Sequence, residues 1–123
     1  MSKVIMVVDD SSSVRRIVST ALGAFGYKTI QGVDGQDALN QLVAGASVDL
    51  IISDVNMPNM DGLTFVGEAR KLEQCQYTPI IMLTTEADAE MKAKGKAVGA
   101  RAWMVKPFQP AQMLAAVKKL MPK

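Results

Sequence analysis

Side chains capable of chemistry follow four short apolar stretches of this sequence, each at the point where the stretch ends. Asp9 and Asp10 follow VIMVV, Asp54 follows LIIS, Thr84 follows IIML, and Lys106 follows AWMV. Three carboxylates gathered at one place cannot all stay ionised without a cation. Because the chain has no histidine and only one cysteine, zinc is a poor candidate. An all-oxygen ligand set favours magnesium instead.

The same residues suit the transfer of a phosphoryl group. Magnesium held by one or two carboxylates keeps several waters and shares its shell with phosphate oxygens. The Thr84 hydroxyl can donate a hydrogen bond to a phosphoryl oxygen, and the Lys106 ammonium can pair with a carboxylate or a phosphate. An aspartate carboxylate can be the nucleophile. Asp54 is the expected acceptor, because the turn segment NMPNMDG that follows leaves it open.

These residues can meet only if the elements before them lie side by side. Short runs, most of them rich in Val and Ile, predict buried strands at residues 4–8, 29–32, 50–53, 80–83 and 102–105. Apolar residues at helical spacing predict five helices between and after them, over about residues 14–25, 38–43, 63–72, 87–98 and 113–121. This alternation indicates a doubly wound α/β fold with a parallel sheet, whose ligands bind at the carboxyl ends of the strands.

Local signals mark where some of these helices begin and end. A serine of the SSS segment can cap the first helix, and Gly26 can stop it. Asp61 and Gly62 are interpreted as turn residues without a role in the site. The fourth helix has few large apolar side chains and contains Gly95, so we expect it to be only marginally stable.

Composition limits the class of protein. The 123 residues make one domain, residues 1–123, and the net charge of +2 comes from scattered basic residues, which argues against nucleic-acid binding. No apolar run approaches the roughly 20 residues that a membrane span needs. The early acids argue against an export signal, and the lone Cys75 fits the reducing cytoplasm. We expect a cytoplasmic monomer that obtains any histidine chemistry from a partner.

Four motifs together resemble the receiver domain of two-component response regulators, in particular its single-domain, CheY-like members. They are VVDD, ISDVNMPNMDG, PIIMLTTE and VKPF, and the resemblance spans nearly the whole chain. It implies a flavodoxin-like, CheY-like sheet of five parallel strands in the order 2-1-3-4-5 with five helices. Any one motif alone would be weak, since paired acids can also be simple helix caps.

The resemblance also implies roles for individual residues. Asp54 is then the phosphoacceptor, and the pair Asp9 and Asp10 binds Mg²⁺ directly and through water. Asn56 ligates the metal through its backbone carbonyl. Lys106 contacts a phosphoryl oxygen, and the bond from Lys106 to Pro107 is commonly cis in the family.

Further positions carry the switching and the lifetime of the phosphoryl group in this family. Thr84 resembles the switch hydroxyl, and Trp103 occupies the place of the switch aromatic. Asn56 and Glu86 occupy the two positions that tune dephosphorylation. The chain departs from the pattern at Trp103, which is usually Tyr or Phe, at Thr85, where Ala is more usual, and at Ser11, where an aromatic is usual in CheY-like proteins.

The function implied is that of a response regulator rather than an enzyme acting on other substrates. A histidine kinase would phosphorylate Asp54, and the fourth helix, fifth strand and fifth helix would bind a downstream protein, such as the flagellar motor switch in chemotaxis. The alternatives are a phosphate sink or a regulator of another pathway. An aspartate-nucleophile phosphatase would need a second acid where Ser11 stands. A flavodoxin-like cofactor carrier would not place two acids where its phosphate binds.

Overall fold

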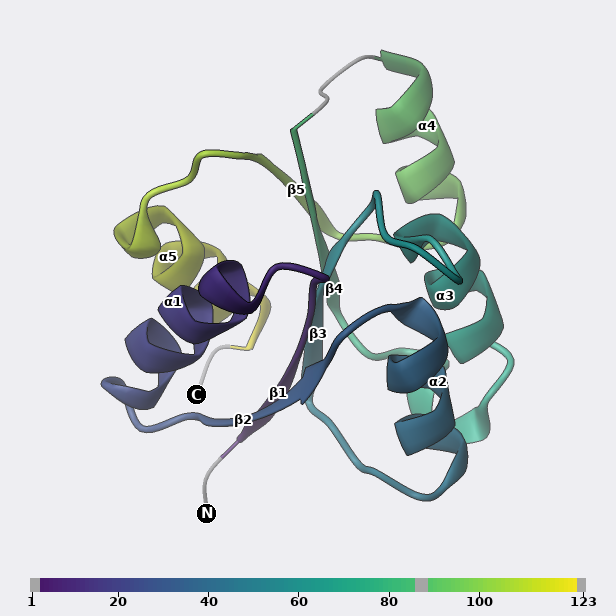
Figure 1. Cartoon of the computed structure of the whole chain (residues 1–123), viewed down its shortest axis with the longest axis horizontal. Helices are drawn as coiled ribbons and strands as arrows, with labels where there is room; N and C mark the ends of the chain where they lie inside the picture. Colours follow the sequence, from purple (N-terminus) through teal and green to yellow (C-terminus); the bar gives the residue numbers. More distant parts are fainter. Residues whose placement is uncertain (1–2, 86–88, 122–123) are drawn as a thin grey trace.

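The computed structural model describes residues 3–85 and 89–121, and Figure 1 shows its arrangement. Its elements, in chain order, are β1 (Val4–Val8), α1 (Ser12–Gly23), β2 (Lys28–Gly32), α2 (Gly35–Val43), β3 (Leu50–Asp54), α3 (Gly62–Ala69), the 3₁₀ turn η1 (Glu73–Cys75), β4 (Ile80–Thr84), α4 (Ala89–Ala97), β5 (Ala102–Val105) and α5 (Pro110–Leu120). No helix in these described stretches has the length and apolar character of a membrane span.

The sheet confirms the fold class that the sequence predicts. Its five strands are all parallel and lie in the order β2-β1-β3-β4-β5. Helices α1 and α5 cover one face, and α2, α3 and α4 cover the other (Figure 1). The chain therefore winds outward from β1 in both directions, and the reversal lies between β1 and β3, where such folds place their ligands.

The predicted strands agree with the observed ones to within one residue. β1 and β5 have the predicted bounds, β2 begins one residue earlier, and β3 and β4 each extend by one residue to Asp54 and Thr84. The side chains of β3 and β4 are buried throughout. Because the sheet is covered on both faces, these strands read as unbroken apolar runs. β2 lies at an edge, which explains how it tolerates polar residues.

Two apolar clusters hold the three layers together. On one face, Ile5 and Ile52 of the sheet pack with residues of α1 and α5 such as Leu22 and Val117. The other face packs Met6, Ile51 and Met82 against α2 and α3, where Phe65 is the largest buried side chain. Burial of each such side chain stabilises the fold by about 1.5–3 kcal/mol. This packing fixes the strand ends relative to one another.

Side-chain caps start three of the helices. The Ser11 hydroxyl accepts a hydrogen bond from the Val14 backbone N–H, so the expected serine cap is confirmed. Asp34 caps α2 in the same way. Asp61, interpreted from the sequence as a turn residue, is the cap of α3 and accepts from the Thr64 N–H. Turns and caps use the same carboxylate-to-backbone hydrogen bond, so the sequence pattern does not separate them.

Candidate functional site

Strand register brings the predicted site residues to one edge of the sheet. Val8 of β1 pairs with Ser53 of β3, and Asp54 pairs with Leu83 of β4. Thr84 in turn pairs with Val105 of β5. The chain reaches Asp9 and Asp10 directly after Val8, and Lys106 directly after Val105. Parallel pairing therefore places all three beyond the carboxyl ends of the strands.

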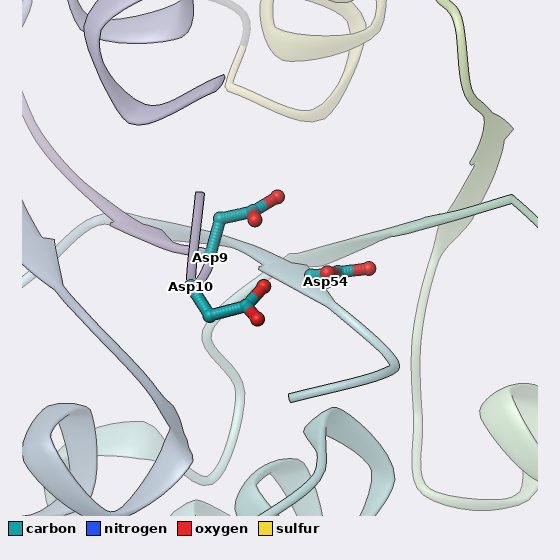
Figure 2. A group of neighbouring side chains, drawn as sticks. All are labelled: Asp9, Asp10 and Asp54. Atoms are coloured by element: carbon teal, nitrogen blue, oxygen red, sulfur yellow. The ribbon is translucent and has the colours of Figure 1, made fainter. Parts of the chain in front are cut away.

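Three carboxylates converge at this edge. Figure 2 shows the side chains of Asp9, Asp10 and Asp54 as neighbours at this edge. One oxygen from each lies within 4.8 Å of the other two. Asp9 and Asp54 are buried, with 0% and 5% of their surfaces exposed, whereas Asp10 is exposed. The pair of acids after β1 therefore divides into one inner carboxylate and one that faces solvent.

Lys106 partly neutralises this cluster. Its Nζ lies 2.8 Å from Oδ2 of Asp9, to which it donates a hydrogen bond, and 3.3 Å from Oδ2 of Asp54. The backbone N–H of Lys106 donates to the Thr84 carbonyl at 2.7 Å, which extends the alignment of β4 and β5. The Lys106–Pro107 peptide bond is cis, as the family resemblance implied.

The pKa values of Asp54 and Lys106 are both raised, for different reasons. Burial raises the pKa of Asp54, the charge of Asp9 raises it further, and Lys106 only partly offsets both. For Lys106, burial alone would lower the pKa, but the hydrogen bond to Asp9 and the charge of Asp54 raise it. Lys106 is therefore held as a cation, while ionised Asp54 is costly without a further positive charge.

The donor set suits a hard divalent cation. Three carboxylates face one ammonium here, so full ionisation would leave an excess of two negative charges. All the donors are oxygens, which magnesium and calcium prefer, and the exposed Asp10 leaves one side open to solvent. Asp9, Asp10 and Asp54 are thus able to share a cation, as the sequence predicts.

The segment from Val55 to Asp61 forms the wall of the site beside Asp54. Asp54 Oδ1 accepts a hydrogen bond from the Val55 N–H at 2.8 Å. The segment closes where the Gly62 N–H donates to the Val55 carbonyl, also at 2.8 Å. A Cβ at residue 62 would lie 2.0 Å from the Asp54 carbonyl oxygen, so only glycine permits this approach. Asn56 is exposed in this segment, two residues after Asp54.

The remaining predicted residues lie around this centre. Thr84 is fully buried at the end of β4. Trp103 lies in β5, partly buried, and packs against Gly95 of α4. Glu86 lies outside the described residues. The structure thus brings together Asp9, Asp10, Asp54 and Lys106, and it places Trp103 at a distance from them along β5.

Sequence reasoning missed the residues that support the site. Asp34, which follows β2, accepts a hydrogen bond from the Asn59 side chain at 2.6 Å. Arg15 of α1 donates to the Asp9 backbone carbonyl at 2.7 Å. The first contact joins residues 25 positions apart in the chain, so no local pattern predicts it, whereas the second spans only six positions. Only Asn59 carried a signal, since asparagine is common where the backbone needs a positive φ.

Comparison with known proteins identifies the class. The response regulator receiver domain family matches residues 5–118 of the chain. The chain belongs to this family, and the topology of its sheet and the acidic cluster at its edge agree with that assignment.

Individual relatives cover almost all of this chain. The chemotaxis protein CheY4 of Vibrio cholerae is 45% identical, with a TM-score of 0.93 over 98% of this chain and 99% of that one. Protein PilG of Pseudomonas aeruginosa is 35% identical over 96% of this chain and 87% of its own length. The probable transcriptional regulator ycf27 of Cyanophora paradoxa is 38% identical over 97% of this chain, which spans 48% of that relative.

Proposed function

We propose that this protein is a response regulator that accepts a phosphoryl group on Asp54 from a phosphohistidine of a partner kinase. The observation that carries the proposal is the convergence of three carboxylate oxygens within 4.8 Å, with the Lys106 Nζ 2.8 Å from Asp9 and 3.3 Å from Asp54. Membership of the receiver family supports it. The missing histidine fits a donor that arrives from another protein.

Asp54 acts as the nucleophile in this proposal. One of its carboxylate oxygens forms a bond to phosphorus while the bond from phosphorus to the donor imidazole nitrogen breaks, and the imidazole leaves with that electron pair. Asp9, Asp10, Asp54 and the backbone carbonyl of Asn56 would hold Mg²⁺, which would supply positive charge to the phosphoryl oxygens. Lys106 adds a second cation, and Thr84 donates a hydrogen bond.

An apolar cavity beside the site offers a surface for the donor protein. It measures about 350 Å³ and is lined by Val14, Ile17, Thr85, Lys106, Pro107 and Phe108. Ile17 is 52% exposed, although it is a large apolar side chain. Because Lys106 belongs to both the cavity and the acidic cluster, a protein seated there would hold its phosphohistidine close to Asp54. We assign this surface to the kinase.

The opposite side of β5 is the proposed output surface. Three cationic side chains, Lys92, Lys96 and Arg101, line a hollow of about 270 Å³ together with Trp103. Among the residues of α4 whose burial is described, only Gly95 is buried, and it has no side chain, so little apolar packing restrains this helix. A phosphoryl group on Asp54 carries about two negative charges in place of the single charge of the carboxylate, and it would draw Thr84 and Lys106 inward, while Trp103 and α4 would rearrange with β5 and α5.

The likeness to CheY4 favours chemotaxis as the pathway, with a component of the flagellar motor switch as the downstream protein. The match to about half of ycf27 supports the alternative that the module regulates another pathway, and a phosphate sink is a further alternative. In each case the protein catalyses only its own phosphorylation and dephosphorylation and acts in the cytoplasm as a monomer. The tuning role of Asn56 and Glu86 is part of the same proposal.

The test uses magnesium and a small acyl phosphate with the purified protein. Magnesium should quench the fluorescence of Trp103, which is the only tryptophan. The acyl phosphate should then add the mass of one phosphoryl group, and Asp54→Asn should abolish the adduct. An adduct that persists in Asp54→Asn, or rapid turnover of phosphomonoesters without any adduct, would contradict the proposal.

A further inference from the structure

The segment that joins β3 to α3 is anchored by the start of α2. The Asn59 Nδ2 donates to Oδ2 of Asp34 at 2.6 Å, and the Gly35 N–H donates to the Met60 carbonyl at 3.2 Å. A Cβ at residue 35 would lie 2.5 Å from that carbonyl oxygen, so the two backbones are in close contact. Residues 25 positions apart in the chain are thus fixed to each other at the edge of the site.

Asn59 adopts a backbone conformation that few residues tolerate. Its φ is +68°, and it is the only residue other than glycine with a positive φ among the described residues. Asparagine accepts this conformation more readily than other side-chain-bearing residues, yet it is still held there at some cost. Its amide has a specific partner in Asp34, which offsets that cost and sets the direction of the turn.

Asp34 is the acceptor in this contact. Among the described residues, it is the only buried acid outside the acidic cluster. The residue is 7% exposed, and its Oδ1 accepts from the Asp37 N–H at 2.8 Å as the cap of α2. The hydrogen bonds from Asp37 and Asn59 lower its pKa, so the carboxylate is ionised at neutral pH. One oxygen therefore caps α2 while the other holds Asn59.

We infer that Asp34 and Asn59 are positioning residues for the metal, because they fix the segment whose Asn56 carbonyl is the proposed fourth ligand. The inference rests on the proposed function. Closure at Gly62 fixes one end of the segment, and the Asp34–Asn59 bond fixes its far side, three residues from Asn56. Groups that orient a ligand in this way change metal affinity by about 10- to 100-fold when they are removed.

Two single variants remove the bond by different routes. Asp34→Ser keeps a good helix cap but does not reach Asn59. Asn59→Gly keeps the positive φ and the charge of Asp34 but lacks the amide. Asp37→Asn is the control for charge, because Asp37 lies in the same turn of α2 and its carboxylate accepts, among the described residues, only from the Val33 N–H and the Gln41 side chain.

Calorimetric titration with Mg²⁺ alone gives the Kd, and urea unfolding with and without Mg²⁺ gives an independent readout. We expect the Kd to rise about 10-fold in each single variant. The double variant should show no further rise, because both changes remove one interaction. Asp37→Asn should keep the Kd of the unmodified protein. Adding Mg²⁺ should raise the free energy of unfolding less in the two single variants and the double variant than in the unmodified protein and Asp37→Asn.

A merely structural role predicts a different result. Asp34→Ser and Asn59→Gly would then lower the free energy of unfolding by the same amount with and without Mg²⁺ and leave the Kd unchanged. This result would overturn the inference about Asp34 and Asn59 but not the proposed function. If the unmodified protein itself neither binds nor is stabilised by Mg²⁺, the proposed function fails first. Additive rises of the Kd in the double variant would also overturn the inference, because they would mean that the two side chains act separately.

Discussion

The indole of Trp103 lies against the backbone of Gly95, so close that a Cβ at residue 95 would be 2.4 Å from Cζ3. The glycine in α4, which weakens this helix, thereby provides the space for a tryptophan in β5. The indole Nε1 is buried and has no hydrogen-bond partner among the described residues. An unpaired buried donor costs about 1–3 kcal/mol. Close packing therefore favours the inward indole, while its unpaired N–H favours a solvated position.

Gly95→Ala should reveal this dependence. Alanine in a helix is more favourable than glycine by about 1 kcal/mol. At residue 95, however, the added methyl group must displace the indole or α4, and overpacking of this kind costs about 1–3 kcal/mol. We expect no gain in the free energy of unfolding and a shift of the Trp103 emission to longer wavelength, measured by urea titration and by fluorescence.

Gly67 of α3 provides the matched control. A Cβ there would meet no atom within 4 Å, so Gly67→Ala should raise the free energy of unfolding by about 1 kcal/mol. Adding Trp103→Phe to Gly95→Ala should restore part of the lost stability, since the smaller ring leaves room for the methyl group. Equal stabilisation by Gly67→Ala and Gly95→Ala would show that the indole moves aside without cost.

Lys106→Met should destabilise the protein in the absence of magnesium. The methionine keeps most of the side-chain volume but removes the only ammonium that contacts Asp9 and Asp54 in the described structure. Hydrogen bonds to charged groups contribute about 1.5–3 kcal/mol each, so we expect a loss of about 2 kcal/mol in urea unfolding. Lowering the pH should reduce this loss, because Asp54, whose pKa burial already raises, then becomes protonated.

An exposed ion pair offers a comparison for Lys106. Lys71 Nζ lies 3.1 Å from Glu68, but the two side chains are 72% and 42% exposed. Solvent screens such a pair, so Lys71→Met should change the free energy of unfolding by less than about 0.5 kcal/mol. Similar losses in both variants would mean that the buried position of Lys106 gives it no special weight.

Asp54→Asn should stabilise the protein without magnesium. Burial and the charge of Asp9 raise the pKa of Asp54, so its ionised form is less favourable in the folded state than in the unfolded state. Removing this cost should add about 1 kcal/mol to the free energy of unfolding at neutral pH, as is common for residues selected for function. Excess magnesium should reverse the order, because the unmodified site, which keeps all three carboxylates, gains more binding energy.

The pH dependence of this gain follows from the direction of the pKa shift. The cost of ionised Asp54 begins as the pH rises past the unfolded value of 3.8 and is complete above the raised folded value. The advantage of Asp54→Asn should therefore be largest above the folded pKa and vanish as the pH falls through that window. Asp61→Asn is the control, since asparagine caps a helix as well as aspartate. A gain independent of pH would exclude an electrostatic origin.

Most of the fold was predictable because burial on both faces leaves a strong local signal. The strands β1, β3 and β4 are apolar throughout, apart from the polar ends of β3 and β4, and their ends carry the acids and the threonine. The order of the strands was not predictable from periodicity, since pairing is a contact between distant segments. It came from the resemblance alone, and the structure confirms it.

The site was predictable where its residues end strands, and not where they support it. Asp9, Asp54 and Lys106 meet because parallel strands end together, which a sequence can show. Elsewhere in the fold, Arg70 at the end of α3 donates hydrogen bonds to the carbonyls of Cys75 and Gly99, and nothing near it in the sequence indicates this. The Asp34–Asn59 contact is of the same kind. Such contacts depend on how loops meet, and that is decided by the packed layers.

The apolar cavity beside Lys106 predicts that donor proteins and small donors respond differently to one substitution. Ile17 lines the cavity and is 52% exposed, so Ile17→Asp should fold normally but should place a charge where the kinase would bury apolar surface. Phosphorylation by the kinase should slow about 10-fold, which corresponds to a loss of about 1.4 kcal/mol in binding free energy. The rate of phosphorylation by a small acyl phosphate should be unchanged. The purified histidine kinases of the source organism are first compared, and the one that phosphorylates the unmodified protein fastest is chosen. The phosphorylation rates of Ile17→Asp and the unmodified protein are then measured with this kinase.

Val43→Asp serves as the control for surface charge in that experiment. Val43 is 66% exposed at the end of α2, on the face of the sheet opposite to α1 (Figure 1), so its substitution should leave both rates unchanged. If Ile17→Asp and Val43→Asp slow the kinase reaction equally, the added charge acts at long range and the cavity is not the contact. If Ile17→Asp slows both donors, the substitution disturbs the Lys106 side of the site itself. Only a loss confined to the kinase reaction assigns the cavity to the donor.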